Sequence, residues 1–204
     1  MLEMQNLAAR RGGALLFSGL DLSLPPGAAL IVSGPNGSGK TTLLRILAGM
    51  TQPAEGTLRW RGREIRAFDA ALRAEMLFIG HAPALKDELT ALENLKSLTE
   101  LHGVVATPDS LRRALDAWAL TRRHALPARV LSQGQRRRVG LARLALLARP
   151  LWVLDEPSAA LDDAGVATLT AVIAGHLARG GSAVIATHQE LALPTDATRS
   201  LSLT

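Results

Sequence analysis

The apolar positions of the chain fall into two patterns whose order predicts an α/β fold. Short apolar runs occupy residues 28–33, 76–80, 151–154 and 182–186. Runs of this length without alternation are typical of strands that are buried on both faces of a parallel sheet. Longer segments between them carry apolar residues at every third or fourth position, as amphipathic helices do. We therefore expect a parallel sheet whose strands are connected by helices.

The N-terminal part of the chain predicts a different arrangement. Residues 2–9 alternate in part between apolar and polar, and a second such run follows at 15–24, after a turn at 10–13. The two runs predict a pair of antiparallel strands. The Pro-Pro-Gly sequence at 25–27 forms a turn that leads into the first buried strand. Residues 57–65 predict a further short hairpin.

Residues 89–128 predict a helical subdomain inserted into this sheet-forming chain. Thr90 is placed to cap a first helix, and Pro108 opens a second one. The apolar stripes of the two helices, which we expect to be core, consist of Leu92, Leu95, Leu98 and Leu101 and of Leu111, Leu115 and Trp118.

Composition excludes several classes of protein. The 204 residues suit one large domain, and a hydrophobic content of 48% excludes a disordered chain. The absence of cysteine excludes a disulfide framework, a thiol nucleophile and a CxxCH haem attachment site. The N-terminus lacks the pattern of a signal peptide, and no apolar run approaches the length of a membrane span, so we expect neither.

The formal net charge of +5 suggests a nucleic-acid partner or an anionic membrane surface. Against nucleic acid, the basic residues are mostly scattered arginines, and three Phe and three Trp without any Tyr provide no platform for stacking bases. For Arg136 and Arg137 we predict a solvated helix face.

One stretch matches the phosphate-binding pattern G-x-x-x-x-G-K-S/T in full. It follows the buried strand at 28–33 and precedes a helical run at 42–48, which is the context that the pattern requires. Its backbone N–H groups and the helix N-terminus would bind phosphate, the lysine would contact the β- and γ-phosphates, and the last hydroxyl would ligate Mg²⁺. The residues predicted to bind the nucleotide here are Gly34, Pro35, Asn36, Gly37, Ser38, Gly39, Lys40, Thr41 and Thr42.

Two acidic residues end the apolar run at 151–154. Asp155 is placed to hold the Mg²⁺ that Thr41 also contacts, and Glu156 to orient or deprotonate the attacking water. His188 follows the strand at 182–186. Because the carboxyl ends of parallel strands meet at one edge of a sheet, we predict that His188 contacts the γ-phosphate.

A further motif opens the helix that we expect to run from residue 133 to about residue 148. Ser132 is placed as its N-cap, and Gly134 would allow the backbone to approach a ligand closely.

Together these stretches resemble the ATPase subunits of ABC transporters. They are the phosphate loop at 34–41, a signature-like Leu-Ser-Gln-Gly-Gln at 131–135, the strand and acidic pair at 151–156, the Ser-Ala-Ala-Leu-Asp loop at 158–162, and His188. Their order and spacing agree over essentially the whole chain. The resemblance implies an ATP hydrolase with a P-loop NTPase core, an N-terminal antiparallel β-subdomain and an inserted helical subdomain.

The resemblance also implies the domain limits and the assembly. The chain would be a single domain in which residues 1–88 and 129–204 form the nucleotide-binding core with its β-subdomain, and 89–128 form the helical subdomain. Two such domains would dimerise head to tail with ATP at the interface. The residues that would contact the partner's ATP are Ser132, Gln133, Gly134 and Gln135, and Asp162 would be a further contact across the interface.

Three positions depart from the family pattern. Arg11 stands where an aromatic residue usually stacks on adenine, and a guanidinium plane can stack there instead. Gln133 replaces the usual Gly or Ala of the signature. His81 occupies the slot of the glutamine that normally serves Mg²⁺ and the attacking water.

The loop at 78–86 with His81, followed by residues 89–95, is similar to one branch of the family, the ATPases of cytochrome c maturation. Residues 15–20 and 34–49 also resemble that branch. The resemblance implies a peripheral subunit on the cytoplasmic face of a bacterial inner membrane, bound to integral membrane permease subunits. Its ATP hydrolysis would support haem export or delivery, or release of a haem-loaded chaperone. Lacking Cys and clustered His, the subunit itself is not expected to bind haem.

Three alternatives stay open at this point. The first is the ATPase of another small ABC exporter, for instance of a lipid or a drug. The second is a non-transport ABC protein that acts on nucleic acid or ribosomes, although such proteins usually carry paired ATPase domains or long inserted arms. The third is a P-loop kinase, which the motif at 131–135 disfavours.

Overall fold

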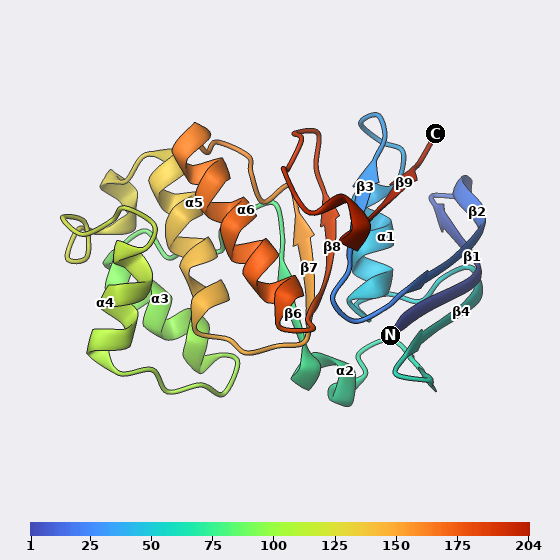
Figure 1. Cartoon of the computed structure of the whole chain (residues 1–204), viewed down its shortest axis with the longest axis horizontal. Helices are drawn as coiled ribbons and strands as arrows, with labels where there is room; N and C mark the ends of the chain where they lie inside the picture. The colour runs from blue at the N-terminus through green and yellow to red at the C-terminus, as the bar shows by residue number, and fades with distance from the viewer. The chain divides into compact units, whose positions relative to one another are not determined.

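The computed structural model describes residues 1–204, which divide into two compact units (Figure 1). The first unit comprises Met1–Phe78, Arg149–Glu156 and Ile173–Thr204, and the second comprises Ile79–Ala148 and Pro157–Val172. The second unit therefore contains more of the chain than the helical subdomain predicted at 89–128, and those predicted limits stay a prediction.

An antiparallel sheet forms the N-terminal part of the first unit, as the alternation predicts. Its strands, in the order β2-β1-β4-β5, are β2 (Ala14–Leu24), β1 (Leu2–Arg11), β4 (Glu55–Trp60) and β5 (Arg63–Glu64). The β4–β5 pair is the predicted short hairpin. The register pairs Leu2 with Leu24 on one side and with Trp60 on the other, so that buried apolar residues face one another across the sheet.

A second sheet has the order β6-β7-β8-β3-β9. Its strands are β6 (Met76–Ile79), β7 (Leu151–Asp155), β8 (Ser182–Ala186), β3 (Ala29–Ser33) and β9 (Thr198–Ser202). The pairs β7–β8, β8–β3 and β3–β9 are parallel. Asp155 and Val32 are both in register with Ala186, so the carboxyl ends of three strands lie at one edge. The α/β fold with a parallel sheet is thereby confirmed.

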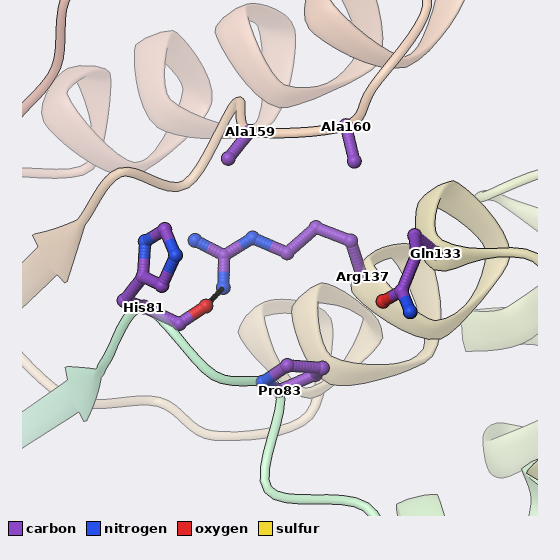
Figure 2. A pocket seen from close by; sticks show the side chains of 6 residues that line it. All are labelled: His81, Pro83, Gln133, Arg137, Ala159 and Ala160. Carbon is purple, nitrogen blue, oxygen red and sulfur yellow. Dashed lines mark hydrogen bonds between the residues drawn. The ribbon is translucent and has the colours of Figure 1, made fainter.

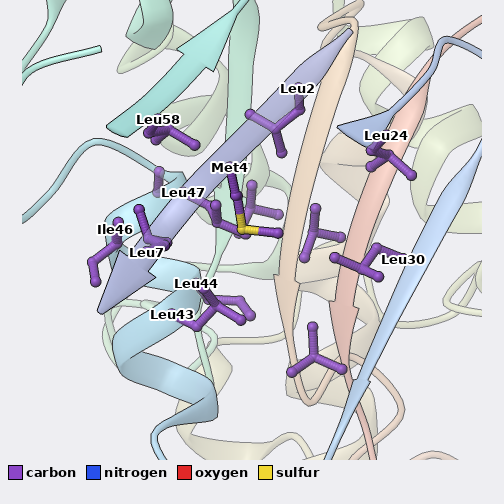
Figure 3. Close-up of a cluster of buried hydrophobic side chains, with 14 of the residues drawn as sticks. Leu2, Met4, Leu7, Leu24, Leu30, Leu43, Leu44, Ile46, Leu47 and Leu58 are labelled. Atoms are coloured by element: carbon purple, nitrogen blue, oxygen red, sulfur yellow. The ribbon is translucent and has the colours of Figure 1, made fainter. Parts of the chain in front are cut away.

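Helix α1 (Lys40–Leu47) packs against this sheet in the first unit. Its buried leucines meet side chains of β1, β2, β3 and β4 in one apolar cluster (Figure 3). Gly49, at φ +64°, ends the helix, because the left-handed conformation lets the Met50 N–H donate to the Arg45 carbonyl. The core thus fixes the helix that begins at Lys40.

Two elements of the first unit could not be predicted from the pattern of hydrophobic residues. Helix α2 (Ala70–Glu75) is a short turn that depends on Asp69, whose carboxylate accepts from the Leu72 N–H and from Arg63. The same contacts hold the pKa of Asp69 well below its usual range. Strand β9 is mostly exposed, so its sequence shows no apolar run, and pairing with β3 alone defines it.

The second unit is helical. Helices α3 (Ala91–Glu100), α4 (Pro108–Asp116) and α5 (Gln133–Ala142) pack on one another, and short 3₁₀ turns lie at η1 (Ala128–Val130) and η2 (Arg143–Ala145). Helix α6 (Asp163–Ala178) passes from the second unit into the first, and a last 3₁₀ turn, η3 (Thr195–Ala197), precedes β9. Helix α5 is shorter than predicted, because the chain tightens into η2 before Pro150.

The predicted stripes of the helical unit are core with two exceptions, Leu92, which is only half-buried, and Leu101. Thr90 and Glu93 form a capping box at the start of α3, and Leu95, Leu98 and Trp118 are buried. Leu101 is 80% exposed, so its prediction as core is wrong. It is the C-cap of α3, and the chain turns away there at Gly103. No helix of the chain is long and apolar enough to cross a bilayer.

A buried histidine predicts how stability depends on pH. The ring of His176 stacks on that of Trp152, with 3.7 Å between centroids, and burial lowers the pKa of His176 to about 4. The unfolded chain therefore binds a proton between about pH 6.5 and 4 that the native chain excludes. We expect the free energy of unfolding to be highest above pH 6.5 and to lose about 2–3 kcal/mol by pH 4 from this group.

Urea unfolding at several pH values measures this effect. Other groups also titrate in the window, so the matched variant is His176→Gln, which removes the titrating ring. Its free energy of unfolding should fall less than that of the parent between pH 6.5 and 4. Equal losses in both proteins would contradict the assignment to His176.

Candidate functional site

The phosphate loop joins β3 to α1 in the first unit and is held from inside by its own lysine. The Nζ of Lys40, which is 8% exposed, donates to the carbonyls of Gly34 (2.7 Å) and Pro35 (3.0 Å). Gly34 needs to be glycine, since a Cβ there would lie 2.3 Å from the Leu203 carbonyl oxygen. Gly39 adopts φ +98° as the N-cap of α1. The loop is therefore a curled backbone around an ammonium group, as the motif predicts.

The same loop contains a buried hydroxyl that has no hydrogen-bond partner. Ser38 Oγ is inaccessible and unpaired, which is costly unless a ligand supplies the bond. The ring of Phe17 packs against the same loop. A Cβ added at Gly39 would lie only 3.2 Å from that ring. Arg11, predicted to stack on adenine, is exposed at the end of β1.

Two oxygen atoms meet at the start of α1 and the end of β7. The hydroxyl of Thr41 donates to Asp155 Oδ2 over 3.0 Å. Asp155 is 3% exposed, and its strand is buried along its whole length. A hydroxyl and a carboxylate are the hard donors that Mg²⁺ prefers. The structure thus brings together the two residues predicted to hold the metal.

Glu156 lies one residue further, in a backbone conformation that glutamate rarely adopts. Its φ is +48°, and its N–H donates to the Ala186 carbonyl at the end of β8. Such left-handed residues cluster at functional sites because the surrounding structure must hold them. Glu156 Oε1 lies 3.5 Å from His188 Nε2. The predicted base and the predicted phosphate contact are therefore neighbours at this sheet edge.

In the second unit the signature-like motif forms the first turn of α5. Ser132 Oγ accepts from the Gln135 N–H, and the Gln135 side chain accepts from the Ser132 N–H, which confirms Ser132 as the N-cap. A Cβ at Gly134 would lie 2.6 Å from the Ala160 carbonyl oxygen. Within this chain, the close approach that Gly134 permits is thus to the backbone after β7.

The two arginines after the motif are not solvated, so that prediction is wrong. Arg136 forms an ion pair with Asp87 (2.6 Å) and donates to the Ala128 carbonyl. Arg137 is 3% exposed and donates to backbone carbonyls. The reason is helical spacing: Arg137 shares its face with the buried Leu141 and Leu144, and this periodicity was the signal available in the sequence.

A cavity of about 110 Å³ lies beside Arg137 (Figure 2). Its lining residues come from three segments of the second unit and are His81, Pro83, Gln133, Arg137, Ala159 and Ala160. His81, in the predicted glutamine slot, and Gln133, the unusual signature residue, therefore both border the same space.

Asp162 has two partners within its own chain. Its Oδ1 accepts from Arg138 (2.5 Å) and from the Gly165 N–H (2.8 Å) in the first turn of α6. These bonds lower the pKa of Asp162, the Gly165 bond most and the Arg138 bond next. The side chain is 68% exposed, which leaves Oδ2 accessible for a contact with another subunit.

Comparison with known proteins identifies the class to which this fold and site belong. The family described as ABC transporter matches residues 17–159, more than half of the chain. The chain belongs to the ABC transporter family and is an ATP-hydrolysing subunit of that class, so the nucleotide that it binds is ATP.

Individual similar proteins show which members of the ABC transporter family the chain resembles. A "Cytochrome c biogenesis ATP-binding export protein" of Cupriavidus metallidurans is 49% identical, over 94% of this chain and 90% of that protein. A putative ABC transporter ATP-binding protein from Pyrococcus furiosus matches with a TM-score of 0.85 and 25% identity, covering 98% and 96% of the two chains. A dimeric post-hydrolysis ATP-binding cassette bound to ADP and Pi gives a TM-score of 0.80 and 25% identity, covering 93% and 88%.

Proposed function

We propose that this chain is the ATP-hydrolysing subunit of an ABC transporter complex that acts in c-type cytochrome biogenesis. The observation that carries the proposal is the 49% identity, over almost the full length of both chains, to a protein named for cytochrome c biogenesis and export. ATP hydrolysis would support export or delivery of haem, or release of a haem-loaded chaperone. The subunit itself does not bind haem in this scheme.

The residues of the phosphate loop fit a bound triphosphate. Lys40 carries the charge, and the unpaired hydroxyl of Ser38 is a hydrogen-bonding group that a phosphate oxygen would satisfy. Thr41 and Asp155 would hold Mg²⁺ together with the phosphates. The metal would neutralise the charge of the β- and γ-phosphates. Arg11 would cover the adenine.

Glu156 and His188 would act on the attacking water and the γ-phosphate. The left-handed backbone fixes the start of the Glu156 side chain, and the side chain then reaches His188 at 3.5 Å. Glu156 would orient the water or take its proton, while His188 would contact the γ-phosphate. His81 would take the position of the family's glutamine.

The active assembly would be a head-to-tail dimer with ATP between the subunits. A similar ATP-binding cassette, described as dimeric in a post-hydrolysis state bound to ADP and Pi, supports a dimeric assembly. Ser132 and Gly134 of one subunit, with Gln133 and Gln135 beside them, would cap the γ-phosphate held by Lys40 of the other. Asp162 keeps an exposed carboxylate for contact across the interface.

The subunit would be peripheral, on the cytoplasmic face of a bacterial inner membrane, with integral permease subunits as partners and no nucleic acid. We expect an affinity pulldown of the tagged chain from detergent-solubilised membranes to recover an integral membrane protein. Recovery of ribosomes or RNA instead would contradict the proposal. A permease with a lipid or drug substrate would favour the alternative, the ATPase of another small exporter.

The surface of residues 81–95 is the place where we expect a helix of the membrane partner to dock. Ala82→Glu and Leu85→Glu put a charge on this surface, which should lower recovery of the partner about tenfold or more and leave ATP binding unchanged. Leu101→Glu is the matched control, because Leu101 is an exposed leucine of the same unit outside this segment. Full recovery of the partner with both test variants would place the docking surface elsewhere.

A further inference from the structure

The side chain of Arg137 is a buried charge that donates hydrogen bonds to main-chain carbonyls. Its Nε donates to the Pro157 carbonyl over 3.1 Å, and its Nη1 donates to the carbonyls of Gly80 and His81, each over 2.9 Å. The residue is 3% exposed. A guanidinium taken out of water is costly unless its N–H groups are bonded, and here these hydrogen bonds offset that cost.

The three carbonyls belong to two separate loops. Gly80 and His81 follow β6, whereas Pro157 follows Glu156 at the end of β7. Arg137 itself belongs to α5, one turn after Gln133 of the signature-like motif. One planar guanidinium therefore ties together the His81 loop, the signature helix and the peptide next to Glu156. The fixed fork of an arginine suits this task, because its donors point in set directions toward more than one acceptor.

The two loops that Arg137 joins border a cavity. The cavity of about 110 Å³ separates His81 and Pro83 from Ala159 and Ala160, and Figure 2 shows the Arg137 side chain extending between the two loops. Groups that line an empty space lack packing contacts on that side. The hydrogen bonds of Arg137 join the two loops beside this space.

We propose that Arg137 is a positioning residue for ATP hydrolysis, which holds the His81 loop in a fixed relation to the peptide that follows Glu156. This inference rests on the proposed role of Glu156 as the group that acts on water. A movement of the His81 loop would be transmitted through the guanidinium to the main chain at Pro157. Arg137 thus acts through its neighbours and does not itself contact the nucleotide.

The test compares two arginine-to-lysine changes on the same helix in the full chain. Arg137→Lys keeps the charge but replaces the fork by one ammonium, so we expect kcat for ATP to fall between about 10- and 100-fold, with KM within about twofold. Arg136→Lys is the matched control, because its ammonium can keep the ion pair with Asp87, and its kcat should equal that of the parent. Circular dichroism and thermal unfolding check that both proteins are folded.

A second variant adds a readout that general destabilisation would not give. In Arg137→Ala, added guanidinium should restore kcat several-fold, whereas ammonium at the same ionic strength should not. Parent-like kcat in Arg137→Lys overturns the proposal. So does an unfolded Arg137→Lys protein, or a rise in KM that accounts for the whole loss, because the role would then be structural or in binding.

A comparison of Arg137→Lys with Glu156→Gln distinguishes failure of the positioning role from failure of the proposed function. If Glu156→Gln is inactive and Arg137→Lys has the parent kcat, only the positioning role fails. If Glu156→Gln hydrolyses ATP at the parent rate, the proposed chemistry fails, whatever Arg137 does.

Discussion

Lys40→Ala should abolish ATP-dependent turnover almost completely, with kcat lower by about 10²–10³-fold or more. The lysine is the charge inside the phosphate loop, where its Nζ lies 2.7 Å from the Gly34 carbonyl and 3.0 Å from the Pro35 carbonyl. Its loss would remove the proposed charge-assisted bonds to the β- and γ-phosphates, which should also weaken ATP binding by about 10-fold or more. A phosphate-release assay and a nucleotide-binding titration measure the two effects separately.

Lys96→Ala provides the control for this substitution. Lys96 is an exposed lysine that forms an ion pair with Glu100, one turn along α3, so its loss should change neither binding nor turnover. Thermal unfolding checks that Lys40→Ala keeps its loop, since the lysine also bonds two loop carbonyls. Normal turnover by a folded Lys40→Ala protein would remove the phosphate loop from the mechanism.

The inner strands of the central sheet could be predicted because a strand that is buried on both faces has an apolar sequence. The strands β3, β7 and β8 are buried on both faces, so each is an apolar run that no exposed position interrupts. Strand β9 and helix α2 have no apolar pattern of this kind in the sequence. The first is exposed on most positions, and the second depends on the contacts of one carboxylate, Asp69. Pairing and capping partners that are distant in sequence are invisible to periodicity.

Some features of the candidate site could likewise be predicted from the sequence, and others could not. The motif order predicted that Thr41, Asp155, Glu156 and His188 lie at one sheet edge, since parallel strands place their carboxyl ends together. The sequence did not predict the left-handed backbone of Glu156, which depends on its bond to the Ala186 carbonyl. Nor did it predict the burial of Arg137, because the residue type argued for solvent while the helical spacing argued for core.

Glu156→Gln should separate chemistry from binding more sharply than any other single change. The amide keeps the shape and most of the hydrogen bonding of the carboxylate but cannot accept a proton from water. Lys40, Thr41 and Asp155 are untouched, so MgATP binding should be retained while kcat falls about 10²–10⁴-fold. Equilibrium binding and phosphate release, measured on the same preparation, give the two quantities.

The same variant tests the composite site. If ATP bridges Lys40 of one subunit and Ser132 of the other, ATP that is not hydrolysed should hold a closed dimer as long as it is present. Size-exclusion chromatography with MgATP should show Glu156→Gln as a dimer and the parent mainly as a monomer. Adding Ser132→Arg, which puts a bulky charge at the exposed N-cap of α5, should return the variant to a monomer. An inactive Glu156→Gln protein that stays monomeric would keep the catalytic role of Glu156 but contradict the bridged dimer, and one that hydrolyses ATP at the parent rate would contradict the catalytic role itself.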